Sequence, residues 1–130
     1  IGVRLVGSEM CIRDRDRDYG LMAGLDRLPY QGHDLLIFSN IESNSGRKNG
    51  TVWLSFDGGT SWPVKKQIEN EGFKYSSLAV GRKNTASEGY IYLLYETGTK
   101  DNINAYGGGI IARFNLSWLM EGKDINRFLK

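Results

Sequence analysis

Three residues with side chains capable of chemistry stand next to strand-like segments of this sequence. Arg47 lies in a polar loop, and its planar guanidinium has the geometry that grips a carboxylate with two hydrogen bonds. Tyr75 carries a phenol that titrates at about pH 10 when free, so it needs a partner to act as a nucleophile. Glu96 ends an almost wholly apolar segment, where a carboxylate needs a partner because burying it alone is costly. Taken singly, these residues are also compatible with a solvated loop arginine, a half-buried strand tyrosine and a surface glutamate.

A turn motif lies between the first two of these residues. The segment SFDGGTSW at positions 55–62 matches the Asp-box pattern S-x-D-x-G-x-T-W, with Ser61 where threonine is usual. Its structural positions are Ser55, Asp57, Gly59 and Trp62. We expect the aspartate to accept backbone hydrogen bonds within its own turn, the glycine to adopt a positive φ and the tryptophan to fold back beneath the hairpin. An ordinary Asp-Gly hairpin near a tryptophan is the other interpretation, and in both cases the motif is a folding device that says nothing of chemistry.

Short strands separated by turn residues are the elements that must position these side chains. The apolar pattern predicts strands over 21–28, 35–38, 51–56, 62–68, 76–80, 90–95 and 108–114, and a helical turn or two over 115–121. Strands and helices do not alternate, which excludes a doubly wound α/β domain. The spacing favours an all-β, antiparallel fold, which leaves a sandwich, a barrel or propeller blades as the architectures.

Composition narrows the classes of function. Seventeen Lys and Arg against fifteen Asp and Glu give a net charge of +2 over 130 residues, and the basic residues are scattered, which argues against nucleic-acid binding. No apolar stretch approaches about 18 residues, so the sequence predicts no membrane span. One cysteine and one histidine argue against a zinc site or a disulfide framework, and we expect no metal site.

The first residues look foreign to the rest of the chain. Positions 1–18 have no helical or strand period and end in alternating Arg and Asp, and the stretch GSEMCIRDR resembles translated sequencing-adaptor read-through. We therefore interpret 1–18 as a non-native or disordered leader and 19–130 as the folded part. Cys11 belongs to the leader, so it carries no argument about redox compartment.

From about position 21 onward the chain resembles the C-terminal part of the bacterial-type exo-α-sialidases, or neuraminidases. The motifs that carry the resemblance are LLIFSNI at 35–41, the loop arginine of SGRKNGTVWLS, the Asp-box, YSSL at 75–78 and YIYLLYE at 90–96. Ile41 stands where the family usually has proline. The resemblance implies a six-bladed β-propeller. A four-stranded blade takes roughly 40–50 residues, so the segment would hold about two blades, with the rest of the propeller upstream.

The resemblance also implies roles for the three chemical residues. Tyr75 corresponds to the family's nucleophile, which suits sialic acid because a carboxylate nucleophile would be repelled by the carboxylate on the anomeric carbon. Arg47 corresponds to the third arginine of a triad that holds this substrate carboxylate. Glu96 corresponds to a glutamate that orients the first arginine of the triad. That arginine, the glutamate that activates the tyrosine and an acid/base aspartate are expected upstream of this segment.

The function implied for the parent protein is retaining hydrolysis of terminal α-linked sialic acid from glycoconjugates. The alternatives are a non-catalytic Asp-box propeller that binds carbohydrate, and a trans-sialidase. Sialylated glycans are the implied partners, no cofactor is implied, and the family is often extracellular or periplasmic. The 130-residue chain alone is expected to be inactive.

Overall fold

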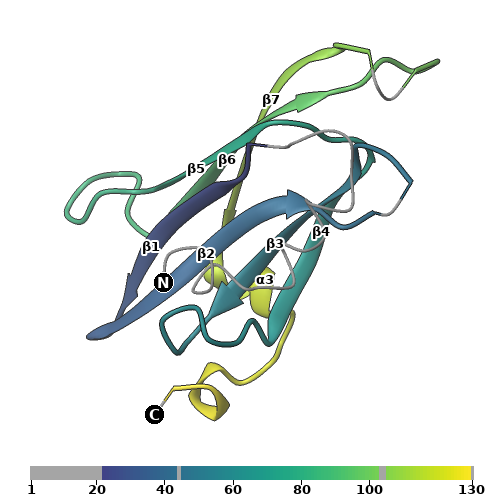
Figure 1. The fold of residues 1–130 in the computed structure, drawn as a ribbon. Coiled ribbons are helices and arrows are strands. Elements are labelled where there is room, and N and C mark those ends of the chain that lie inside the picture. The colour runs from purple at the N-terminus through teal and green to yellow at the C-terminus, as the bar shows by residue number, and fades with distance from the viewer. Residues whose placement is uncertain (1–21, 44, 103–104, 130) are drawn as a thin grey trace.

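A computed structural model describes residues 22–43, 45–102 and 105–129, and the strands found there form two antiparallel sheets (Figure 1). The first sheet consists, in spatial order, of β1 (Gly24–Tyr30), β2 (His33–Ile41), β3 (Lys48–Ser55) and β4 (Val64–Gly72). The second consists of β5 (Ser76–Val80), β6 (Tyr90–Thr97) and β7 (Gly108–Asn115). Consecutive strands are always neighbours within a sheet, so the predicted all-β antiparallel class is confirmed. The leader predicted at 1–18 lies outside the described residues.

A two-residue turn joins β1 and β2, in the interval between the strands predicted over 21–28 and 35–38. It consists of Gln31 and Gly32, whose φ angles of 46° and 81° are the two positive values that a two-residue hairpin turn requires. Tyr30 pairs with His33 directly beside this turn. The histidine therefore begins β2 and does not lie in the turn itself.

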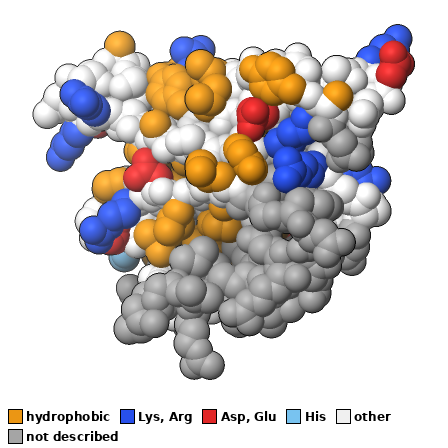
Figure 2. Space-filling view, turned by 45° about the horizontal axis from the view of Figure 1, so that its top comes forward, with side chains coloured by type: hydrophobic (Ala, Val, Ile, Leu, Met, Phe, Trp, Pro, Cys, Tyr) orange, Lys and Arg blue, Asp and Glu red, His pale blue; other side chains and the backbone are white. Residues whose placement is uncertain are grey.

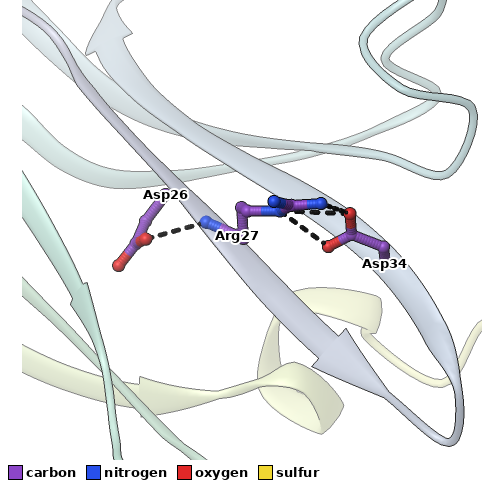
Figure 3. Close-up of polar contacts among 3 residues, drawn as sticks. All are labelled: Asp26, Arg27 and Asp34. Carbon is purple, nitrogen blue, oxygen red and sulfur yellow. Dashed lines mark hydrogen bonds and ion pairs between the residues drawn. The ribbon is translucent and has the colours of Figure 1, made fainter.

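An ion pair links the two strands of this hairpin (Figure 3). The Arg27 side chain of β1 donates hydrogen bonds to both carboxylate oxygens of Asp34 in β2. These hydrogen bonds, together with the guanidinium charge, hold the pKa of Asp34 below its usual value. Both side chains are exposed, so water screens the pair and its contribution to stability is small. The neighbouring Asp26 joins the two sheets, because its carboxylate accepts the Val80 N–H of β5 at 3.1 Å.

The main core lies between the two sheets. Side chains that alternate along β2, β3 and β6 point into it, as the period of two predicts. Its most deeply buried members from these three strands are Leu35, Ile37, Val52, Leu54, Ile91 and Leu93. Ile37 of β2 and Leu54 of β3 pair across the strands, so their side chains lie on the same face of the first sheet, toward the core.

A second, aromatic cluster lies on the opposite face of the first sheet. Phe38 packs with its ring centroid 5.8 Å from that of Trp53 and 5.8 Å from that of Trp62. Strand β3 is therefore buried on both faces over 50–55, and its apolar residues Val52, Trp53 and Leu54 follow one another without alternating with polar ones. Phe56, the last residue of the strand predicted over 51–56, follows the end of β3 and stacks on Phe128 with a ring-centroid distance of 5.0 Å.

The helical turn expected over 115–121 is present as α3 (Leu116–Met120). The Asn115 side chain caps its N-terminus by accepting the Trp118 N–H, and Glu121 ends it in the left-handed conformation. Lys66 of β4 binds this helix, with its ammonium 3.8 Å from the Trp118 ring centroid and 2.7 Å from a Glu121 carboxylate oxygen. A short 3₁₀ turn, η1 (Ile125–Arg127), follows and was not predicted.

The outer face of the second sheet carries exposed apolar side chains. Leu94 of β6 and Ile111 of β7 pair across the strands, and both are exposed. Figure 2 shows hydrophobic side chains gathered on the surface of the molecule. Exposed apolar side chains that lie next to each other, such as Leu94 and Ile111, are typical of a surface that contacts another part of a larger structure.

Among the residues that the structure describes, no helix is long and apolar enough to cross a membrane. No group of three or more His, Cys, Asp or Glu side chains in this part of the chain is placed to hold a metal ion.

Candidate functional site

Three connections between strands lie at the same end of the two sheets (Figure 1). They are the β2–β3 loop (described at 42–43 and 45–47), the β4–β5 connection at 73–75 and the β6–β7 loop (described at 98–102 and 105–107). The antiparallel registers place them together, since the pairs at this end are Ile41 with Gly50, Lys48 with Gly72, Ser76 with Tyr95 and Thr97 with Gly108. Arg47, Tyr75 and Glu96 all lie in or next to these connections, so the fold gathers the three predicted site residues at one end.

Backbone hydrogen bonds hold the β4–β5 connection between the two sheets. The Phe73 N–H donates to the Arg47 carbonyl at 2.9 Å, which attaches the connection to the first sheet. On the other side, the Lys74 N–H donates to the Glu96 carbonyl at 2.9 Å, and the Glu96 N–H donates to the Tyr75 carbonyl at 3.1 Å. Three consecutive residues therefore bring together an arginine, a tyrosine and a glutamate that are far apart in sequence.

The buried side chain of Phe73 holds the β4–β5 connection in the core. Its side chain is fully buried, and its ring stacks on Tyr95 with a centroid distance of 4.7 Å. Burial, and secondarily the charge of Glu69, raises the pKa of the Tyr95 phenol. The other side of the Phe73 ring lies against Gly50, where an added Cβ would come within 2.0 Å of a ring carbon. The Phe73 ring can occupy this position only because residue 50 has no side chain.

The side chains of Arg47 and Tyr75 contact each other next to the β4–β5 connection. The guanidinium carbon of Arg47 lies 5.7 Å from the centroid of the Tyr75 ring, within the range of a cation–π interaction. Tyr75 is 44% exposed, so a ligand can reach its phenol. Glu96 is partly buried and joins the group through its backbone. The cluster thus offers a cation for an anionic group beside an accessible hydroxyl.

The Asp-box lies at the opposite end of the first sheet, in the β3–β4 turn. The Ser55 hydroxyl donates to an Asp57 carboxylate oxygen at 2.9 Å and accepts the Gly59 N–H at 2.8 Å. The same carboxylate accepts the N–H of Ser61 at 2.9 Å and its hydroxyl at 2.6 Å. Gly59 has a φ of 93°, as expected from the motif, and the preceding Gly58 is also positive at 73°.

The remaining member of the motif is its tryptophan. Trp62 is only partly buried and packs on Phe38 of the aromatic cluster. Its indole N–H is buried and has no hydrogen-bond partner among the described residues. The motif fixes the hairpin through its serine, aspartate and glycine, and it contributes no group to the site around Tyr75.

Hydrogen bonds lower the pKa of the Asp-box aspartate. Burial acts to raise the pKa of Asp57, but the hydrogen bonds from Ser61 and Ser55 outweigh it and hold this pKa below its ordinary value. A carboxyl with a lowered pKa in the folded state contributes stability above its unfolded pKa. That contribution is lost as pH falls through the lower, folded pKa.

We expect Asp57→Asn to lower the free energy of unfolding by about 1 kcal/mol at neutral pH, because the neutral amide accepts the three hydrogen bonds less strongly. Below the ordinary carboxyl pKa of 3.8 the difference from the wild type should narrow, because Asp57 itself becomes protonated. Urea unfolding of both proteins at several pH values measures this gap. Asp101→Asn, at an exposed loop position, is the control and should change little. A gap that stays constant down to the lowest pH would contradict the role of the charge.

Similarity to known proteins extends over much of this chain but over a small part of each relative. No protein-family model matches the sequence. The sialidase of Micromonospora viridifaciens is 38% identical over 85 residues, which cover 65% of this chain and 11% of that protein. The sialidase of Bacteroides fragilis (strain YCH46) is 41% identical over 69 residues, which cover 51% of this chain and 12% of that protein. The chain thus spans about a tenth of the length of these curated relatives.

Solved structures show the same relationship. The Hadza microbial sialidase Hz136 superposes with a TM-score of 0.58 at 27% identity, over 76% of this chain and 18% of its own. The intramolecular trans-sialidase from Ruminococcus gnavus, solved in complex with oseltamivir carboxylate, gives a TM-score of 0.60 at 24% identity, over 78% of this chain and 23% of its own. The chain is therefore similar to part of a sialidase, and its two antiparallel sheets correspond to about two blades of a sialidase β-propeller.

Proposed function

We propose that this chain is part of a longer enzyme that removes terminal α-linked sialic acid from glycoconjugates. The observation that carries the proposal is the contact between Arg47 and an exposed Tyr75, on a connection that also binds the backbone of Glu96. Similarity to the two curated sialidases supports the same class of reaction.

The chemistry of sialic acid explains why an arginine should lie beside a tyrosine. The sugar carries its carboxylate directly on the anomeric carbon, so a guanidinium that binds this carboxylate also fixes the reacting carbon. In the proposed mechanism Arg47 binds the carboxylate and the Tyr75 hydroxyl attacks the anomeric carbon. The hydroxyl proton passes to a glutamate outside this segment, while an aspartate, also outside, protonates the departing glycan oxygen.

Two displacements account for the proposed retention of configuration. The first breaks the bond from the anomeric carbon to the glycan oxygen and forms one to the Tyr75 oxygen. In the second, water loses a proton to the aspartate and attacks the same carbon, and the tyrosine leaves and regains its proton. Glu96 is assigned the role of orienting another arginine of the substrate-binding triad.

The proposal is tested with the longer protein that contains this segment. A fluorogenic sialoside and a sialyl-oligosaccharide should both be cleaved, with free sialic acid as the product. Transfer of sialic acid to an added sugar acceptor would instead identify a trans-sialidase. Binding of the oligosaccharide without turnover would identify a non-catalytic propeller, and it would overturn the hydrolase proposal. The 130-residue chain alone should show no turnover, because it lacks the other groups that the mechanism uses.

We expect Arg47→Lys in the longer protein to raise KM for a sialoside roughly tenfold to a hundredfold. An ammonium cannot form the paired hydrogen bonds of a guanidinium with a carboxylate, and a hydrogen bond to a charged group contributes about 1.5–3 kcal/mol. Steady-state kinetics measures the change. Lys48→Met is the matched control, because it removes the neighbouring cation at the start of β3 and should leave KM within about twofold of wild type. A larger effect at Lys48 than at Arg47 would move the carboxylate-binding role to the lysine.

A further inference from the structure

Lys74, between Phe73 and Tyr75, is buried although lysine is rarely buried. It is 5% exposed, and its ammonium donates a hydrogen bond to the backbone carbonyl of Ala105. A buried charge is costly unless it is paired or hydrogen-bonded, so a lysine at this position needs such a partner. No step of the proposed mechanism uses this residue, and no motif in the sequence pointed to it.

The carbonyl that Lys74 binds belongs to the β6–β7 loop. The Gly107 N–H donates to the Thr97 carbonyl at 2.8 Å and closes the loop where it leaves the sheet. An added Cβ at Gly107 would lie 2.0 Å from the Gly98 carbonyl oxygen, so the two sides of the loop approach closely there. Within the loop, the Ala105 N–H donates to the Asn102 carbonyl at 3.1 Å. Lys74 reaches this loop from a different connection, the one that carries Tyr75.

Lys74 therefore contacts two other segments of the site at once. Its backbone N–H binds the Glu96 carbonyl at 2.9 Å, and its side chain binds Ala105. Glu96 in turn donates to the carbonyl of Tyr75, so the tyrosine, the glutamate and the loop after β6 are connected through this residue.

We propose that Lys74 is a positioning residue of the site, whose ammonium fixes the β6–β7 loop against the Tyr75–Glu96 pair. This inference rests on the proposed function. Without the ammonium the loop loses its attachment to the β4–β5 connection, and the backbone that carries Tyr75 and Glu96 gains freedom. Small displacements of a reacting group lower the rate of the chemical step more than they weaken substrate binding.

The test compares Lys74→Met with Lys74→Arg in the longer protein. Methionine has a similar length without a donor, whereas arginine keeps a cationic donor. We expect Lys74→Met to speed hydrogen exchange of the Gly107 amide and to lower kcat per folded molecule roughly tenfold or more, with KM changed less than about threefold. Lys74→Arg should retain most of the wild-type protection of the Gly107 amide and most of the wild-type kcat. Lys100→Met, at an exposed position of the same loop, is the matched control and should leave both measurements unchanged.

Two results would overturn the inference. One is a Lys74→Met protein whose kcat per folded molecule stays within twofold of wild type, which would leave the lysine a purely structural role. The other is a Lys74→Arg protein as slow as Lys74→Met, which would mean that a cationic donor is not what the site needs. If the wild-type protein cleaves no sialoside, the proposed function fails by itself, and exchange at Gly107 still decides whether the lysine holds the loop.

Discussion

Replacing Tyr75 by phenylalanine is expected to lower kcat of the longer protein for a sialoside by at least about a thousandfold. The change removes one oxygen atom and keeps the ring, so the contact with the Arg47 guanidinium and the backbone bond to Glu96 stay possible. A loss of kcat would therefore indicate that the Tyr75 hydroxyl is the attacking group. KM should change far less than kcat, because the carboxylate of the substrate is bound by the arginine.

A second tyrosine of the same sheet supplies the control for this experiment. Tyr90 begins β6 at the opposite end from Glu96, and its ring lies 4.6 Å from the Arg113 guanidinium carbon. Tyr90→Phe also removes a hydroxyl from a tyrosine beside an arginine, but it should leave kcat within about twofold of wild type. If Tyr75→Phe behaves like Tyr90→Phe, the nucleophile is another group and the assignment of Tyr75 is wrong.

The strands were predictable because they follow local rules. Alternation of apolar residues located β5 with its observed bounds and placed β6 and β7 to within two residues at each end. The strands of the first sheet were located less closely, since β2 and β4 extend beyond the predicted 35–38 and 62–68, but the Asp-box predicted the β3–β4 turn and the positive φ of Gly59. Strand β1 overlaps the strand predicted over 21–28, but it begins at Gly24 and continues through Pro29 to Tyr30.

The construction of the site was not predictable from such patterns. The connection at 73–75 is too short to have a period, and its hydrogen bonds join it to residues far away in sequence. Phe73, Gly50 and Lys74 were therefore missed, although they seat and hold the segment that carries Tyr75. A buried lysine cannot be told from a surface lysine by residue type, because the partner that permits its burial is a backbone carbonyl with no signature in the sequence. Arg47 and Tyr75 were expected to act on the same substrate only because the motifs around them resemble a known family, and their direct contact was not predicted.

The packing of the Phe73 ring against Gly50 predicts a large loss of stability for Gly50→Ala. The new methyl group would lie 2.0 Å from one Phe73 ring carbon and 2.4 Å from another, so the buried ring must move. Overpacking of this kind costs typically about 1–3 kcal/mol, and we expect the free energy of unfolding to fall by about that amount. Since the Phe73 N–H binds the Arg47 carbonyl, displacement of the ring should also separate Arg47 from Tyr75 and lower kcat/KM of the longer protein.

Gly109→Ala is the matched control for Gly50→Ala, because both glycines lie in strands and the nearest atom to an added Cβ at position 109 is 3.9 Å away. That variant should be as stable as wild type or slightly more stable, since alanine restricts the unfolded chain more than glycine does. Phe73→Ala alone should cost about 3–5 kcal/mol by leaving a cavity. Adding Gly50→Ala to it should cost little further, because the ring that the methyl group would strike is gone. Urea unfolding of the four variants measures this coupling. Additive losses in the double variant would show that position 50 acts on stability by some route other than the seat of the Phe73 ring.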